Sequence, residues 1–255
     1  VLIEAELWPV LLRQCKHRSI PVIQVNGRVS EKSIKLYGIF PAFLWWMTES
    51  IKQFSMRSLT DADRFLQLGL AKEKVLVTGN IKFDSTSEAE DPFQPQWKDD
   101  SMILVFGSTR PGEEGPIMDA LVRLQKEFPN LIGVIAPRHM ERCREVEDLI
   151  REFEVEYALL SKQGNLTNCN VLLVDSLGKL NAFYKSATVT YVGGGFNPRF
   201  GGHNILEPAA LGKPVLFGKF MNNFEEEAKL LKQSEGGLQL QNIEELYDVL
   251  KWLLI

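Results

Sequence analysis

The stretch YVGGGFNPRFGGHNILEPAALGKPVLFG, which occupies residues 191–218, decides the predicted fold of this chain. It runs from an apolar segment through a glycine-rich loop into a helical pattern and a second apolar segment, and so predicts strand, loop, helix and strand. Consecutive glycines let the backbone turn sharply and approach a ligand, and the first turn of a helix offers unpaired N–H groups to an anion. We therefore interpret this unit as a nucleotide-binding element.

Two interpretations of this unit stay open on the residues alone. The glycines can simply form a tight turn, with Glu207 complementing the positive end of the helix dipole. Alternatively, Glu207 accepts hydrogen bonds from the hydroxyls of a ribose beside a bound phosphate. The second interpretation is favoured by polar side chains of the loop that can contact a ligand, namely Asn197, Arg199, His203 and Asn204.

The composition is that of an α/β protein with room for two modest domains. The 255 residues are 45% hydrophobic and 24% charged, with a net charge of −4, so no nucleic-acid partner is expected. The three cysteines lack metal-ligand spacing, so no zinc site is expected. No apolar stretch reaches the ~18 residues needed to span a bilayer. The aromatic segment 39–47 is typical of a core and, as an open alternative, of a lipid interface.

The alternation of apolar and helical segments predicts two α/β lobes. Residues 1–84 are assigned to the remainder of an N-terminal lobe, which we expect to be truncated because the chain opens in a strand-like segment. Residues 85–100 combine prolines and acids with little periodicity, which predicts an interdomain linker. Residues 101–255 alternate more regularly and predict a Rossmann-like C-terminal lobe.

Polar loops follow the strands of the predicted second lobe at 108–110, 137–139, 175–180 and 193–204. Ligands of doubly wound sheets bind beyond the carboxyl ends of the strands, so these loops are expected to converge on one site. Arg138 would place a permanent positive charge there for a phosphate, and His139 is interpreted as a hydrogen-bond donor. Structural roles as an ion-pair partner or a helix cap remain open for both.

The first lobe carries two pairs of acids. Asp61 and Asp63 match the Asp-x-Asp spacing of metal-dependent sugar transferases, but a helix start with Thr60 as its N-cap explains them better, so no metal is expected. Glu4 and Glu6 follow the first predicted strand. Because alternate residues of an extended segment point to opposite sides, at most one of these two faces a site unless the chain turns.

These motifs together resemble the 3-deoxy-D-manno-octulosonic acid (Kdo) transferases of lipopolysaccharide assembly, and the resemblance covers nearly the whole chain. It is carried, in the order and approximate spacing of that family, by IEAELWP (3–9), VNGRVSEKS (25–33), LTDADRFLQLG (59–69), VTGNIKFD (77–84), GSTRPGEE (107–114), APRHMER (136–142), DSLGKLNAFYKSA (175–187) and GGHNILEPAALGKPVLFG (201–218).

The resemblance implies the α/β GT-B fold, with two Rossmann-like lobes of which the N-terminal one binds the acceptor and the C-terminal one the nucleotide donor. It implies a glycosyltransferase that moves Kdo from CMP-Kdo to a lipid A precursor on the cytoplasmic face of the bacterial inner membrane and releases CMP. No catalytic metal and no cofactor are expected. The proposed base of the family lies upstream of Val1, so we expect this chain to be inactive alone.

The resemblance also implies roles for particular residues. Glu4 and Glu6 are candidate catalytic or acceptor-orienting acids, and Arg28 and Lys82 are candidate contacts for the Kdo carboxylate or acceptor phosphates. The candidate donor-binding residues are Ser108, Pro137, Arg138, His139, Leu177, Gly178, Lys179, Asn204, Ile205, Leu206 and Glu207.

Three positions depart from the pattern of that family. Arg110 stands where a histidine is common, Lys179 where a glutamate is common, and Ile205 where a proline is common. Residues 177–179 resemble a second CMP-binding loop of that family. The departures favour contacts between the backbone of this second CMP loop and the nucleotide. Two other functions remain open: a different GT-B nucleotide-sugar transferase or epimerase, and a non-catalytic nucleotide-binding module.

Overall fold

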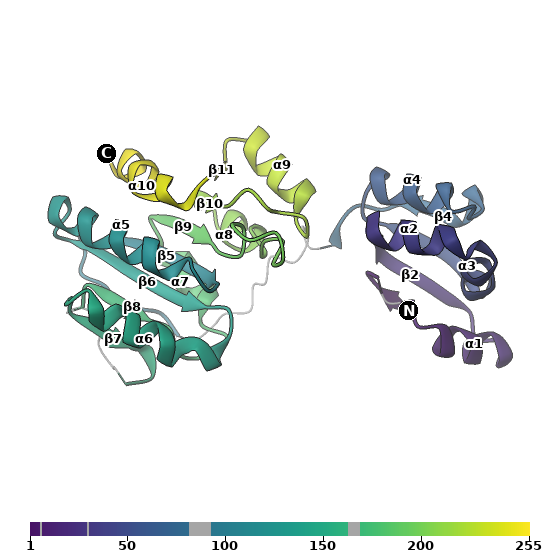
Figure 1. The fold of residues 1–255 in the computed structure, drawn as a ribbon, viewed down its shortest axis with the longest axis horizontal. Helices are drawn as coiled ribbons and strands as arrows, with labels where there is room; N and C mark the ends of the chain where they lie inside the picture. Colours follow the sequence, from purple (N-terminus) through teal and green to yellow (C-terminus); the bar gives the residue numbers. More distant parts are fainter. Residues whose placement is uncertain (6, 30, 82–92, 163–168) are drawn as a thin grey trace. The chain divides into compact units, whose positions relative to one another are not determined.

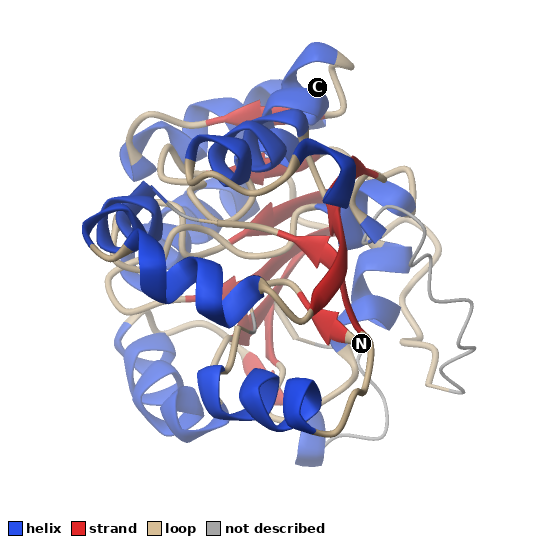
Figure 2. Ribbon diagram, turned by 90° about the vertical axis from the view of Figure 1, so that its right-hand side faces the viewer, coloured by secondary structure: helices blue, strands red, loops and turns tan. Residues whose placement is uncertain are grey.

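The computed structural model describes the chain except for residues 6, 30, 82–92 and 163–168. The chain divides into two compact units, Val1–Thr86 and Ser87–Ile255. Each unit is built on a parallel sheet (Figure 1), and helices surround the strands (Figure 2). The predicted α/β class, with two Rossmann-like lobes, is confirmed.

In the described part of the first unit, the sheet has four strands in the order β1-β2-β3-β4. Each strand pairs in parallel with the next strand of the chain, so each connection must cross back over the sheet. Segment 52–58, whose pattern fits either a connector or a strand, contributes to β3. The elements are β1 (Leu2–Ile3), α1 (Pro9–His17), β2 (Val22–Gly27), α2 (Glu31–Ile39), α3 (Pro41–Thr48), β3 (Ile51–Met56), α4 (Leu59–Gln67), η1 (Lys72–Lys74) and β4 (Val75–Val77).

Helix α4 begins at a Ser58 N-cap, whose Oγ accepts a hydrogen bond from the Asp61 amide at 3.0 Å. The predicted helix start is therefore confirmed, whereas the prediction of Thr60 as its N-cap is wrong. The reason is that β3 ends at Met56 and the extended backbone at Ser58 already turns into the helix, which places Thr60 inside the first turn.

The Asp61 carboxylate is buried and joins α4 to the loop after β2. It accepts hydrogen bonds from the Val29 amide, the Arg57 Nε and the Ser58 hydroxyl, each at 2.9 Å. These three hydrogen bonds satisfy the buried carboxylate and hold its neighbours in place. Asp61 thereby fixes the position of the segment that carries Arg28.

The second unit contains a seven-stranded parallel sheet in its described residues, in the order β11-β10-β9-β5-β6-β8-β7. The chain starts in the interior at β5, proceeds outward through β6 to β7 and β8, then returns to β9 on the other side of β5. The elements are β5 (Met102–Thr109), α5 (Glu114–Glu127), β6 (Leu131–Pro137), η3 (Met140–Arg142), α6 (Cys143–Glu152), β7 (Tyr157–Leu159), η4 (Leu160–Lys162), β8 (Val171–Leu173), α7 (Leu180–Ser186), β9 (Val189–Val192), α8 (Leu206–Ala210), β10 (Val215–Phe217), α9 (Glu225–Gln233), β11 (Gly237–Gln239), η5 (Ile243–Glu245) and α10 (Leu246–Leu254).

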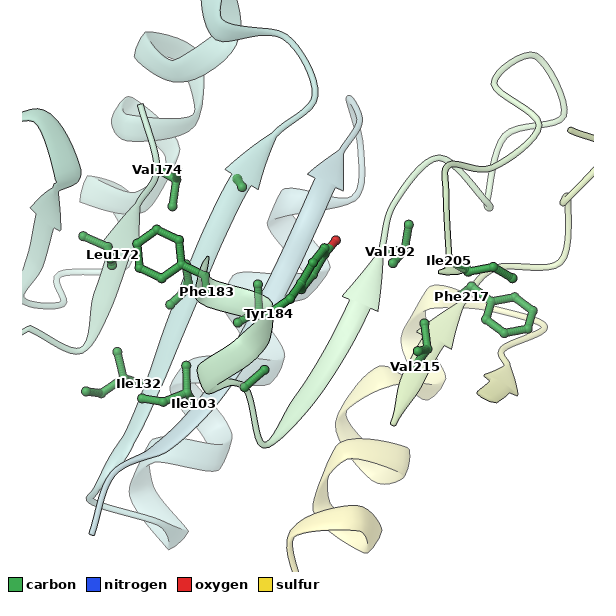
Figure 3. Close-up of a cluster of buried hydrophobic side chains, with 14 of the residues drawn as sticks. Ile103, Ile132, Leu172, Val174, Phe183, Tyr184, Val192, Ile205, Val215 and Phe217 are labelled. Atoms are coloured by element: carbon green, nitrogen blue, oxygen red, sulfur yellow. The ribbon is translucent and has the colours of Figure 1, made fainter. Parts of the chain in front are cut away.

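Helices cover both faces of this sheet because alternate strand residues point to opposite sides. In β5, Ile103 and Val105 belong to one core cluster, and Leu104 and Phe106 belong to the other. The first cluster packs against α7 and α9, and the second against α5, α6 and α10. Figure 3 shows Phe183 of α7 lying over the strands in the first cluster.

Residues 93–100, the described part of the segment predicted as a linker, contain no helix or strand and belong to the second unit, where they pack against α7. The rings of Phe93 and Trp97 pack against Phe183, with centroids 5.6 and 6.1 Å away. The indole Nε1 of Trp97 donates a hydrogen bond to the Ser186 hydroxyl at 3.0 Å.

The aromatic segment 39–47 contributes to α3, and its side chains divide between core and surface. Leu44 and Met47 are buried, whereas Phe43, Trp45 and Trp46 are exposed. Throughout the described residues, every helix is too short or too polar to cross a bilayer.

Candidate functional site

The carboxyl ends of β5 and β9 mark the point where the strand order of the second sheet reverses. These two strands pair directly in the sheet, although β6, β7 and β8 lie between them in the sequence (Figure 1). In open α/β sheets, ligands bind in the crevice outside such a reversal. The polar loops after β5, β6 and β9 therefore meet where the fold predicts a site.

Glu113 connects two of these loops. Its carboxylate accepts hydrogen bonds from the amides of Gly194, at 2.8 Å, and Arg110, at 2.9 Å. Burial raises the pKa of Glu113 to about 6 despite these hydrogen bonds, because the charged form loses its hydration. Glu113 was not among the predicted site residues, although it lies in the quoted GSTRPGEE segment.

The three consecutive glycines serve mainly the packing of neighbouring backbone. A Cβ on Gly193 would lie 2.5 Å from the Ser108 carbonyl oxygen, and a Cβ on Gly195 would lie 2.6 Å from the Gly218 amide nitrogen. The amide of Gly194 already donates to Glu113. The interpretation that these glycines let the backbone approach a ligand therefore needs correction, because protein atoms occupy the space that they leave.

The side chain of Arg110 lies at the centre of the converging loops. Its Nε donates to His203 Nε2 at 3.0 Å, its Nη1 lies 2.6 Å from His139 Nε2, and its guanidinium stacks 4.6 Å from the centre of the Phe200 ring. A backbone hydrogen bond also joins the loops after β5 and β6, since the Arg138 amide donates to the Thr109 carbonyl at 3.1 Å. Arg110 was named as a departure from the family pattern and was not predicted as a site residue.

The surroundings of His203 keep its ring neutral. Burial, followed by the charges of Arg110 and Arg138, lowers the pKa of His203 to about 4. The neutral ring can accept the Arg110 hydrogen bond through Nε2. The shared influence of Arg110 and Arg138 on His203 also shows that cations from two loops face the segment before α8.

Residues 204–207 are organised around the start of α8, a helix of five residues. The Asn204 side chain accepts from the Leu206 amide at 3.2 Å and donates to a Glu207 carboxylate oxygen at 3.0 Å. Ile205 is fully buried in the core cluster of Figure 3, and Leu206 is 8% exposed. Of the four predicted donor-binding residues here, Asn204 and Glu207 present polar side chains, while Ile205 and Leu206 offer only backbone groups.

The predicted second CMP loop lies after β8, which pairs with β6 and β7 in the sheet. Leu177 is 78% exposed, and Gly178 has a φ of 77°, a conformation that favours glycine. The ammonium of Lys179 lies 5.3 Å from the centre of the Phe93 ring. This contact turns Lys179 toward residues 93–100.

Ser108 and Pro137 occupy the strand ends themselves. Ser108 has a φ of 55°, unusual for a residue with a side chain, at an irregularity of the β5–β6 pairing. Pro137 is the last residue of β6 and is buried, and it is followed by exposed Arg138 and His139. The predicted residues Ser108, Pro137, Arg138 and His139 are thus brought together.

The candidate residues of the first unit meet at the ends of β1 and β2. Glu4 has a φ of 56°, so the chain turns directly after β1, and its amide donates to the Val25 carbonyl at 3.0 Å. The Arg28 Nε lies 3.6 Å from a Glu4 carboxylate oxygen. The structure therefore pairs Glu4 with Arg28, while the candidates Glu6 and Lys82 lie outside the described residues.

Residues 1–85 match the family model described as 3-deoxy-D-manno-octulosonic-acid transferase (kdotransferase). The 3-deoxy-D-manno-octulosonic acid transferase of Haemophilus influenzae is 35% identical over 249 residues, which cover 95% of this chain and 58% of the relative. This chain is therefore similar to Kdo transferases over nearly its whole length. The resemblance predicted from the sequence is thereby confirmed.

Solved structures extend this result to the second unit. The C-terminal CMP-Kdo binding domain of WaaA from Acinetobacter baumannii is 29% identical and matches with a TM-score of 0.58, over 61% of this chain and 81% of that domain. A UDP-N-acetylglucosamine 2-epimerase from Listeria monocytogenes, described as putative, matches 100% of this chain and 65% of its own length with a TM-score of 0.63. At 14% identity, that match bears on the fold alone, and it agrees with the GT-B class.

The chain spans only part of the length of the curated relatives that it matches. It spans 58% of the Haemophilus influenzae protein and 59% of the Chlamydia pneumoniae relative.

Proposed function

We propose that this chain supplies the donor-binding lobe and part of the acceptor-binding lobe of a glycosyltransferase that moves Kdo from CMP-Kdo to a lipid A precursor. The observation that carries the proposal is the convergence of Arg110, Arg138, His139 and residues 203–207 beyond the carboxyl ends of β5, β6 and β9. A solved relative of this unit is described as a CMP-Kdo binding domain. In this proposal residues 1–84 belong to the acceptor lobe, 85–100 to the linker and 101–255 to the donor lobe.

Each part of CMP has a group suited to it in this arrangement. Arg138, which is exposed beside Pro137, would bind the phosphate, and its permanent charge would stabilise the negative charge that develops as CMP leaves. This stabilisation supports a reaction without a metal ion. Glu207, oriented by Asn204 at 3.0 Å, would accept hydrogen bonds from the ribose hydroxyls. The backbone of residues 177–179 would complete the nucleotide site.

The acceptor contacts are proposed for the first unit. Arg28, held near Glu4, is suited to an anionic group such as the Kdo carboxylate or an acceptor phosphate. Glu4 would orient the acceptor or stabilise charge in the transition state, and Glu6 and Lys82 are proposed from the family pattern alone. The exposed aromatic residues of α3 support attachment to a lipid surface, which we propose to be the cytoplasmic face of the inner membrane.

Calorimetric titration with CMP and with UDP tests the donor assignment. We expect CMP to bind at least about tenfold more tightly than UDP, since the site is proposed to be shaped for one phosphate and a cytosine. Tighter binding of UDP would favour the alternative that the fold likeness raises, a nucleotide-sugar transferase or epimerase with another donor.

A second titration tests whether the ribose assignment is correct. Glu207→Ala should weaken CMP binding about 5- to 150-fold, because hydrogen bonds to a charged group contribute about 1–3 kcal/mol. Glu152→Ala, which removes an exposed carboxylate at the end of α6, is the matched control and should leave the affinity unchanged. Equal affinities for the two variants would contradict the role of Glu207 and favour a non-catalytic module.

A further inference from the structure

Arg110 is held in one orientation by groups from two other loops. Its Nε and Nη1 contact the ring nitrogens of His203 and His139 at 3.0 and 2.6 Å, and Phe200 stacks against its plane. A guanidinium stays protonated in proteins and only donates hydrogen bonds, so both imidazoles act as acceptors. An arginine side chain that is already oriented loses less conformational freedom when it binds a ligand.

The groups that orient Arg110 do not neutralise its charge. Within the described residues, no carboxylate forms an ion pair with its guanidinium, whereas Arg142 nearby contacts Glu114 at 2.6 Å and Glu145 at 3.0 Å. The nearest acid, Glu113, directs its carboxylate to the backbone amides of Gly194 and Arg110. A partly exposed cation is thus left without a charged partner at the carboxyl edge of the sheet.

Arg138 is a second cation near Arg110. Burial, followed by the charge of Arg138, lowers the pKa of Arg110, although Glu113 acts in the opposite direction. The charges of the partly buried Arg110 and the exposed Arg138 repel one another, and an oxyanion that contacts both would relieve that repulsion. Arginine is also well suited to the task, because its fork of N–H groups matches the oxygens of phosphate and carboxylate.

We propose that Arg110, oriented by His203, His139 and Phe200, is a further donor-binding residue that contacts an oxyanion of the donor beside Arg138. The inference rests on the proposed function. CMP-Kdo offers two oxyanions, the phosphodiester and the sugar carboxylate, and both have the chemistry that this site recognises. The outer face of the guanidinium is available to either, since the described residues place no protein partner on Nη2.

Calorimetry with cytidine, CMP and CMP-Kdo tests this role in the wild-type chain, Arg110→Ala and Arg110→Lys. If Arg110 contacts the phosphate, Arg110→Ala weakens CMP binding about 10- to 100-fold and leaves cytidine binding within about twofold. If it contacts the carboxylate, CMP binding is unchanged and CMP-Kdo binding falls by that factor. Arg110→Lys should recover part of the loss in either case, because it keeps the charge but not the fork.

The matched control is Arg123→Ala, which removes an arginine of α5 that pairs with Asp119 at 3.5 Å and stacks on Tyr247. It should bind all three ligands as the wild type does. The inference is overturned if Arg110→Ala binds CMP and CMP-Kdo as tightly as the wild type, or if it loses cytidine binding to the same extent, which would indicate a purely structural role. A wild-type chain that binds neither CMP nor CMP-Kdo would contradict the proposed function as well.

Discussion

The Glu113 carboxylate accepts a hydrogen bond from the Gly194 amide at 2.8 Å and so joins the loop after β5 to the loop after β9. These loops flank the reversal of strand order, where β5 and β9 lie side by side. Glu113 is 4% exposed, so its hydrogen bonds are protected from water. This buried acid therefore holds the two loops together, alongside the hydrogen bond between Arg110 and His203.

Glu113 should make the stability of the chain depend on pH. Burial raises the pKa of Glu113 from 4.5 to about 6, so the folded state binds its proton more tightly than the unfolded state does. The stabilising contribution is therefore complete below pH 4.5 and is lost as the pH rises through about 6, by about 2 kcal/mol.

The comparison of Glu113→Gln with the wild type isolates the pH-dependent contribution of Glu113 to stability from the contributions of other titrating groups. The glutamine side chain of the variant cannot ionise, so the stability of the wild type relative to the variant should fall by about 2 kcal/mol between pH 4.5 and pH 7, as measured by urea unfolding. A difference that stays constant across this range would show that Glu113 titrates at its ordinary pKa.

His203 should remain neutral well below the ordinary range of histidine. Its pKa is lowered to about 4 from 6.5, so its contribution to stability is lost as the pH falls between these values. Proton NMR can follow each of the three histidines of the chain. Arg110→Ala should move the pKa of His203 upward, because one of the repelling charges is gone. Titration of His203 near 6.5 in the wild type would contradict the described contacts.

Much of this architecture could be predicted from the sequence, because local patterns determine it. Alternating apolar and helical segments indicate the strands and helices, and polar residues after strands indicate the edge where the loops meet. Arg138 and His139 were predicted on this basis, and the structure places His139 against the Arg110 side chain and joins the Arg138 amide to Thr109, the residue before Arg110.

What could not be predicted depends on contacts between distant segments. The role of Glu113 requires that residue 113 meet residue 194, and no local pattern encodes that pairing. The glycine loop was interpreted as open to a ligand because the sequence cannot show that Gly218 packs against Gly195. Ile205 illustrates a third limit, since a five-residue helix is too short for its periodicity to indicate which side chains are buried.

The contact between Gly195 and Gly218 should prevent the second unit from accommodating a methyl group at residue 218. A Cβ on Gly218 would collide with the carbonyl group of Gly195, and backbone atoms cannot move aside as a side chain can. Gly218→Ala should therefore destabilise the chain by about 1–3 kcal/mol or more in thermal unfolding.

Gly115→Ala is the matched control for this substitution. Gly115 lies in α5 with no atom within 4 Å of the position that its Cβ would take, so alanine should stabilise the chain by up to about 1 kcal/mol. Equal stability of the two variants would show that the loop after β9 is not packed against Gly218.

Asp61 should be essential for the first unit, whereas Asp63 should not. Asp61→Ala leaves the largely buried Arg57 Nε and the Val29 amide without their acceptor, which should cost about 3–5 kcal/mol. Asp63→Ala changes an exposed position and should remain within about 0.5 kcal/mol of the wild type. Amide hydrogen exchange in β3 measures both effects. Similar losses in the two variants would instead indicate that the acids act together, as in an Asp-x-Asp metal site.

The central claim is that a cytidine nucleotide binds beyond the carboxyl ends of β5, β6 and β9. Amide hydrogen exchange of the chain with and without saturating CMP tests it most directly. Protection should appear in residues 108–113, 137–140 and 193–207, and it should be absent in Arg138→Ala and retained in the exposed control Arg144→Ala. Protection confined to the hollow at the amino ends of β6 and β8, which is lined by Asn130, Leu131 and Asn170, would contradict the account.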